Sequence, residues 1–92
     1  MPYHVSWTRG ALKALRSIDP RQGMIIASWV NENLEGCDNP TRVGDCSRLR
    51  GVDNGWRWRV GRHRILGTVH GNELQIVIFR VGDRKNVYQH LQ

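Results

Sequence analysis

The sequence predicts an α+β domain with the element order β-α-α-β-β-β, in which a helical hairpin packs on a twisted antiparallel sheet. Two adjacent segments with helical periodicity follow a short alternating segment near the N-terminus. Three segments with the period of two that is typical of strands lie in the second half. The stretches between them are rich in Gly, Asn and Asp and suit turns. We expect residues 1–92 to form a single domain.

The first half of the chain is expected to contribute one strand and both helices. Residues 3–7, YHVSW, alternate and form the first strand, and Thr8 suits the N-cap of a helix through ALKALRSI. Asp19 and Pro20 then end this helix and begin a second one through RQGMIIASWVNENL, because proline fits the first helical position. The expected buried positions of the two helices are Ala11, Leu12, Leu15, Ile18, Met24, Ala27, Trp29, Val30 and Leu34.

Residues 35–55 read as a loop with at most a short strand near Arg48–Arg50. Cys37 and Cys46 flank part of this loop, and their spacing allows either two reduced thiols or a disulfide that staples it. No apolar run approaches the length of a membrane span, and the N-terminus lacks the layout of a signal peptide. We therefore expect a cytoplasmic protein with no membrane partner.

Three strands are expected after this loop, at Trp56–Val60, His63–His70 and Leu74–Val81. Two-residue turns at Gly61-Arg62 and Gly71-Asn72 would join them. The first turn places Arg59 opposite Arg64, Trp58 opposite Ile65 and Val60 opposite His63, and the second places Arg64 opposite Phe79 and Ile65 opposite Ile78. The core face is then Trp58, Ile65, Val69, Leu74, Ile76 and Ile78, and the other face carries Arg57, Arg59 and Arg64 around Leu66, Val77 and Phe79.

Positive charge gathers in this second half. The net charge is +6, and residues 42–92 hold ten basic and four acidic side chains. Twelve of the fourteen basic residues are arginines, whose guanidinium groups match phosphate bidentately. Two directly opposed arginines repel each other by up to about 1 kcal/mol, a penalty that an anionic ligand would reverse. These features favour a polyanion partner such as nucleic acid, with a solvated basic surface as the alternative.

Several short motifs, taken in order, resemble the RelE branch of the RelE/ParE toxin superfamily. They are ALKAL in the first helix, NP at 39–40, RLRG before the hairpin, WRWRVGRHRI within it, and VGDRKNVY at 81–88. The resemblance implies a small cytoplasmic endoribonuclease that cuts messenger RNA on the ribosome by 2′-hydroxyl attack, without a metal or other cofactor. It also implies a RelB-like antitoxin partner, contacts with the ribosome and its message, and contact with operator DNA through the antitoxin complex.

The resemblance also implies roles for individual residues. The catalytic set would be Arg64, Arg84 and Tyr88, with RNA bound by Arg50, Arg57, Arg59, Arg62, His63 and Lys85. The best-known relatives have lysines where this chain has Arg57 and Arg59, and arginine does not readily act as a base. His63 has a suitable ordinary pKa for proton transfer, although the expected register places it on the opposite face. No histidine cluster has metal-ligand spacing.

Two other functions fit parts of the same pattern. One is a ParE-like toxin that binds DNA gyrase without catalysis, which the resemblance disfavours because that branch generally lacks the arginine and tyrosine at the C-terminal end. The other is a basic RNA-binding module that does not cleave. Loss of toxicity on substitution of Arg64, Arg84 or Tyr88 would separate the nuclease from both.

Overall fold

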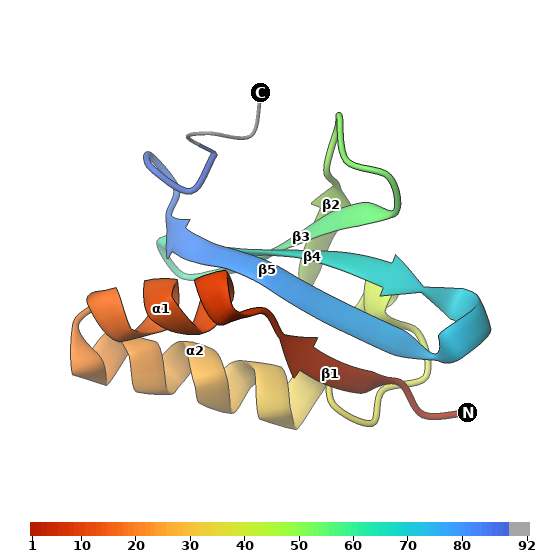
Figure 1. Cartoon of the computed structure of the whole chain (residues 1–92). Helices are drawn as coiled ribbons and strands as arrows, with labels where there is room; N and C mark the ends of the chain where they lie inside the picture. Colours follow the sequence, from red (N-terminus) through yellow and green to blue (C-terminus); the bar gives the residue numbers. More distant parts are fainter. Residues whose placement is uncertain (89–92) are drawn as a thin grey trace.

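The computed structural model describes residues 1–88, which form a five-stranded sheet with both helices on one face (Figure 1). The strand order is β1-β5-β4-β3-β2. The α+β class with a helical hairpin on the sheet is therefore confirmed. The elements are β1 (His4–Trp7), α1 (Arg9–Ser17), α2 (Pro20–Asn33), the 3₁₀ turn η1 (Pro40–Arg42), β2 (Asp45–Arg48), β3 (Gly55–Val60), β4 (His63–His70), the 3₁₀ turn η2 (Gly71–Glu73) and β5 (Gln75–Asp83).

Two features of the sheet differ from the expected arrangement. β1 runs parallel to β5, whereas the other three pairs are antiparallel. No hairpin joins β1 to β5, so the intervening helices and strands leave the direction of this edge strand free. The short strand expected near Arg48–Arg50 lies earlier, at Asp45–Arg48, because it pairs with β3 from Asp45 opposite Arg59 to Arg48 opposite Trp56.

The predicted helix starts are largely confirmed. Thr8 caps α1, since its Oγ1 accepts a hydrogen bond from the backbone N–H of Ala11 at 3.1 Å. Pro20 is the first residue of α2, and Asp19 occupies the cap position without a side-chain cap bond. The link between the helices is so short that they fold into a hairpin, and α1 packs against β5.

The inner face of α2 is rotated relative to the prediction. Met24 is 70% exposed, and Ile26, which the pattern missed, is 1% exposed. Gly23 lets this face of α2 lie close against α1, because a Cβ at this position would lie only 3.2 Å from the carbonyl oxygen of Leu15. Leu12 is also exposed rather than buried. The main core contains Ala11, Ile26, Val30, Leu34, Trp58, Ile65, Ile76, Ile78 and Val81.

The register of the first strand hairpin is confirmed, and that of the second is wrong. Arg59 lies opposite Arg64 across the Gly61-Arg62 turn, as expected. At the second turn, η2 and a left-handed Leu74 make a longer connection, so His70 pairs with Gln75. A β-bulge then adds Phe79 to β5, and Arg64 lies opposite Gly82 instead of Phe79. Ile65 accordingly pairs with Val81.

A second, smaller hydrophobic cluster occupies the sheet face away from the helices. Leu49, Leu66 and Val87 are buried there, and Val52, Phe79 and Tyr88 pack against them. The apolar floor expected around Leu66 is therefore covered, because the β2–β3 loop and the C-terminal turn lie over it (Figure 1). This cluster attaches residues 84–88 to the sheet.

The two cysteines are free thiols, although both pack against the main core. Burial raises the pKa of the Cys37 thiol, and it raises the pKa of Cys46 to about 11, with a smaller contribution from the Asp45 carboxylate. No helix within residues 1–88 is long and apolar enough to cross a membrane.

Candidate active site

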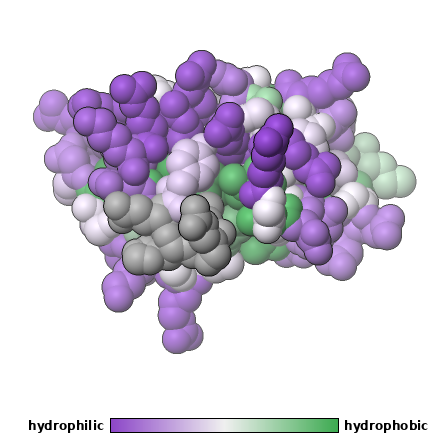
Figure 2. All heavy atoms as spheres, turned by 90° about the horizontal axis from the view of Figure 1, so that it is seen from above, coloured by the Kyte–Doolittle hydropathy of each residue, from purple (hydrophilic) through white to green (hydrophobic). Residues whose placement is uncertain are grey.

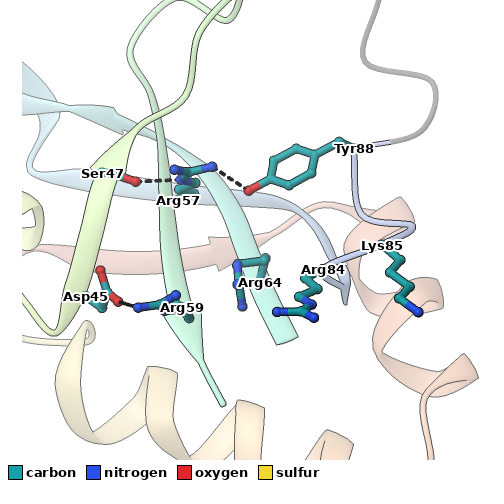
Figure 3. A pocket seen from close by; sticks show the side chains of 8 residues that line it. All are labelled: Asp45, Ser47, Arg57, Arg59, Arg64, Arg84, Lys85 and Tyr88. Atoms are coloured by element: carbon teal, nitrogen blue, oxygen red, sulfur yellow. Dashed lines mark hydrogen bonds and ion pairs between the residues drawn. The ribbon is translucent and has the colours of Figure 1, made fainter. Parts of the chain in front are cut away.

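A cationic hollow of about 600 Å³ opens on the sheet face that the helices leave uncovered (Figure 3). Hydrophilic side chains dominate this face when it is viewed from above (Figure 2). Three strands and the turn after β5 supply the lining residues. They are Asp45 and Ser47 from β2, Arg57 and Arg59 from β3, Arg64 from β4, and Arg84, Lys85 and Tyr88 from the C-terminal turn.

The strand ladder places the basic side chains by its alternation. Arg57 and Arg59 point away from the helices because Trp58 between them enters the core. Ser47 lies opposite Arg57, and Asp45 lies opposite Arg59. Arg64 faces Gly82 across β4 and β5, and a Cβ at Gly82 would lie 3.4 Å from the Cβ of Val87 in the C-terminal turn.

Arg57 connects β2 to the C-terminal turn. Its Nε donates a hydrogen bond to Ser47 Oγ at 2.5 Å, and its Nη1 donates to the Tyr88 hydroxyl at 2.9 Å (Figure 3). The guanidinium carbon lies 5.9 Å from the centroid of the Tyr88 ring, so the cation also contacts the ring. These contacts hold the Tyr88 hydroxyl at the hollow.

Arg59 and Arg64 turn to different acceptors. Arg59 Nη2 lies 2.5 Å from the Asp45 carboxylate. Arg64 Nη1 donates to the carbonyl oxygens of Gly61 and His63, at 3.4 and 3.2 Å, within its own hairpin turn. The two opposed cations are thereby kept apart without a ligand.

The C-terminal turn is built by Asp83 and carries Arg84 into the hollow. Asp83 Oδ1 accepts a hydrogen bond from the Lys85 N–H at 2.8 Å, and the Asp83 carbonyl accepts one from the Val87 N–H at 2.8 Å. The Lys85 N–H is the largest cause that lowers the pKa of Asp83, and nearby Arg62, His63 and Lys85 lower it further. Within residues 1–88, the Arg84 guanidinium has no hydrogen-bond or ion-pair partner, so it is available to an anion.

Comparison with known proteins identifies the family. A model of the ParE toxin of type II toxin–antitoxin systems matches residues 5–88. The chain is a toxin of the RelE/ParE superfamily. Among curated proteins, none matches its sequence.

Solved RelE structures share the fold of this toxin. The toxin–antitoxin complex RelBE2 from Mycobacterium tuberculosis is 26% identical, with 91% of this chain and 100% of that chain covered and a TM-score of 0.78. The RelB–RelE complex from Methanococcus jannaschii is 27% identical, with 94% and 98% covered and a TM-score of 0.62. The isolated RelE toxin from E. coli is 18% identical, with 88% and 83% covered and a TM-score of 0.65, and it supports the fold alone.

The structure of the toxin brings together most of the residues selected from the sequence. Arg57, Arg59, Arg64, Arg84, Lys85 and Tyr88 all line the hollow. Arg62 lines a neighbouring hollow that shares Arg59, Arg64, Arg84 and Lys85 with the first. Arg50 is exposed in the turn after β2, outside the main hollow.

His63 lies on the other side of the sheet from the hollow. It is 8% exposed and shares its strand face with Ile65, which faces the helices. The register across the Gly61-Arg62 turn already indicated this face.

Two lining residues of the toxin, Asp45 and Ser47, were missed by sequence reasoning. They alternate with Cys46 in the short segment DCSR, which has no β-branched residue and whose composition predicts a loop. The pattern that could have identified them is the period of two in this segment. It puts Asp45 and Ser47 on one face, opposite Arg59 and Arg57, once the segment pairs with β3. Within the described part of the chain, no cluster of His, Cys, Asp or Glu could hold a metal ion.

Proposed function

We propose that this toxin is a ribosome-dependent endoribonuclease that cleaves messenger RNA through attack by the RNA's own 2′-hydroxyl, without a metal, and so inhibits translation in the cytoplasm. The observation that carries the proposal is the convergence of four arginines and a lysine with Tyr88 in one open hollow. An open face suits a single strand, whose phosphates need cations and whose bases stack on aromatic rings.

The chemistry assigns the cations different tasks. Attack of the 2′-oxygen on phosphorus builds negative charge on the phosphorane oxygens, and fixed cations at that point lower the barrier. Arg84 is the best placed to bind this charge because its guanidinium has no partner within residues 1–88. Arg64 lies beside it, held only by carbonyl oxygens, and can turn to the same phosphate. Arg59, Arg62 and Lys85 would hold flanking phosphates.

We also propose that a RelB-like cognate antitoxin binds this toxin. The related structures from M. tuberculosis and M. jannaschii are toxin–antitoxin complexes. An exposed cationic hollow binds RNA through charge, so an antitoxin that covers it or keeps it from the ribosome would suppress activity. Contact with operator DNA would then occur through the antitoxin.

Inhibition of DNA gyrase is the second candidate function. The observation that favours it is the family model, which describes ParE toxins. In this case the basic face would bind a protein instead of RNA, and Arg84 and Tyr88 would have no chemical role.

Translation of a reporter message on purified ribosomes tests both candidates. We expect wild-type toxin to cut the message within ribosome-bound codons, and the Arg84→Ala variant to lose at least about 100-fold in rate, as for removal of one oxyanion donor. Arg16→Ala, an exposed change in α1 away from the hollow, is the matched control. Intact message together with inhibition of purified gyrase would replace the nuclease with the second function.

A further inference from the structure

Ser47 is joined to Tyr88 through a single guanidinium. Arg57 donates through Nε to Ser47 Oγ at 2.5 Å and through Nη1 to the Tyr88 hydroxyl at 2.9 Å. Ser47 and Tyr88 are far apart in the sequence, and Arg57 on β3 bridges them (Figure 3). Two of the fixed donor directions of Arg57 therefore have protein partners.

In this series of hydrogen bonds, the position of Ser47 is fixed by the sheet. Ser47 is directly opposite Arg57 in the ladder between β2 and β3, so backbone pairing places its Cα beside the Arg57 side chain. The guanidinium is planar, and fixing its Nε–H direction also fixes the direction of Nη1. The tyrosine end is held less firmly, because Tyr88 is only partly buried and packs beside Val87 in the small cluster.

We propose that Ser47 is a positioning residue for the cleavage: by accepting the Arg57 Nε–H, it orients the guanidinium that holds the Tyr88 hydroxyl in the hollow. This inference rests on the proposed nuclease function and adds a residue to it. It also changes the task of Arg57, which orients Tyr88 in addition to attracting phosphate.

The direction of the hydrogen bonds specifies what Tyr88 offers to RNA. Its oxygen accepts from Arg57, so its own O–H is left to donate. The acceptor on the RNA would be a phosphate oxygen or the 2′-oxygen of a nucleotide bound between Tyr88 and Arg84. Misplacement of such a donor by about 1 Å is enough to slow a reaction markedly, even when binding is unchanged.

Single-turnover cleavage on programmed ribosomes tests this assignment with five variants. They are Ser47→Ala, Ser47→Thr, Tyr88→Phe, the double variant Ser47→Ala with Tyr88→Phe, and Ser28→Ala as an exposed control on α2. We expect Ser47→Ala to lower the maximal rate about 10-fold with little change in the toxin concentration at half-maximal rate. Ser47→Thr, which keeps the hydroxyl, should restore most of the rate, and Ser28→Ala should match wild type.

The double variant distinguishes positioning from a general structural effect. If Ser47 acts through the Tyr88 hydroxyl, Ser47→Ala should cause no further loss in the Tyr88→Phe background. Equal losses in both backgrounds, or a wild-type rate for Ser47→Ala, would overturn the inference while leaving the nuclease function standing. Absence of cleavage by wild type would instead remove the proposed function itself.

A readout independent of activity follows the guanidinium directly. In nuclear magnetic resonance spectra of the toxin, the Arg57 Nε–H should exchange slowly with water and should exchange faster in Ser47→Ala, while Ser28→Ala leaves it unchanged. Fast exchange of this proton in wild type would also overturn the proposal, because it would show that Ser47 does not hold the guanidinium.

Discussion

Arg59 and Arg64 lie directly opposite each other on β3 and β4, and each guanidinium turns to a different acceptor. Arg59 binds the Asp45 carboxylate, and Arg64 binds carbonyl oxygens of its own hairpin turn. The sheet therefore holds two like charges at adjacent positions before any ligand is present. The Asp45 carboxylate on β2 offsets part of the repulsion between these two arginines.

Replacing Asp45 tests what this carboxylate does. Asp45→Asn should lower the free energy of unfolding by at most about 1 kcal/mol, because both partners of the ion pair are more than half exposed. It should raise the affinity for single-stranded RNA, since a negative charge leaves the hollow and Arg59 is released. Urea unfolding and fluorescence anisotropy with an RNA oligonucleotide measure the two effects.

Glu32→Gln on α2 is the control for the Asp45 substitution, because it makes the same charge change on the opposite side of the molecule. A similar gain in affinity for both variants would mean that only net charge matters. A loss of RNA affinity in Asp45→Asn would indicate that Asp45 orients Arg59 for binding.

The two tryptophans of β3 should respond very differently to substitution by phenylalanine. Trp58 is fully buried and donates through Nε1 to the carbonyl oxygen of Pro40 at 2.9 Å. Trp58→Phe should lower the free energy of unfolding by about 2–4 kcal/mol, because it leaves a cavity and removes the shorter of two hydrogen bonds to the Pro40 carbonyl, which keeps only the Val43 N–H at 3.4 Å. Trp56 is only partly buried under Arg48, so Trp56→Phe should cost less than about 1 kcal/mol in chemical denaturation.

Val87 should link local order in the C-terminal turn to activity. It is 2% exposed and belongs to the small cluster with Leu49 and Leu66. Val87→Ala should speed amide hydrogen exchange at residues 84–88 and slow RNA cleavage, because it loosens the segment that carries Arg84. The amides of Ile65 and Ile78 in the main core should stay protected, and their exposure to the same degree would contradict this prediction.

The C-terminal turn should also loosen in acid. Its hydrogen bond from the Lys85 N–H lowers the pKa of Asp83, so the folded state favours the carboxylate. The resulting stabilisation is complete above the ordinary pKa of an aspartate and is lost as the pH falls through the lower folded value. Exchange of the Lys85 amide against pH, compared with the non-titrating Asp83→Asn variant, measures this. An identical pH response in both would assign the effect to another group.

The Cys46 thiol should be unreactive at neutral pH. Burial raises its pKa to about 11, so little thiolate is present at pH 8. Alkylation should be slow in the folded protein and fast in urea. Because the pKa of Cys46 is higher in the folded protein, the neutral buried thiol contributes to the free energy of unfolding. This contribution is fully present below the ordinary thiol pKa and is lost as the pH rises from about 9 to about 11. Rapid alkylation of the native protein would contradict this.

The sequence was most informative where local geometry decides the structure. The Gly61-Arg62 turn fixes the register of β3 and β4, and this register correctly placed Arg57, Arg59 and Arg64 on one face. The predicted register of the second hairpin was wrong because the 3₁₀ turn at Gly71–Glu73 and the bulge at Phe79 depend on packing that no local sequence pattern shows. The same limit applied to α2, where close contact with α1 at Gly23 determines which side is buried.

The site was predictable only in part for a related reason. Arg84 and Tyr88 follow the last strand, and nothing in their spacing shows that the turn folds back over the sheet; the family resemblance selected them. Ser47 and Asp45 were missed because β2 has weak strand propensity and gains its structure from pairing with β3. Their partners, Arg57 and Arg59, were identified, but not the side chains that contact them.

The bulge at Phe79 shifts the alternation of inward and outward side chains along β5 by one residue. Ile76 and Ile78 before it and Val81 after it all face the helices, although strict alternation would put Val81 on the other side. Flattening the bulge with every residue kept would turn Val81 out of the core, whereas deleting Phe79 would remove the extra residue and leave Val81 facing the helices by plain alternation. Both halves of β5 therefore face the helices only because the sheet accommodates one extra residue at Phe79.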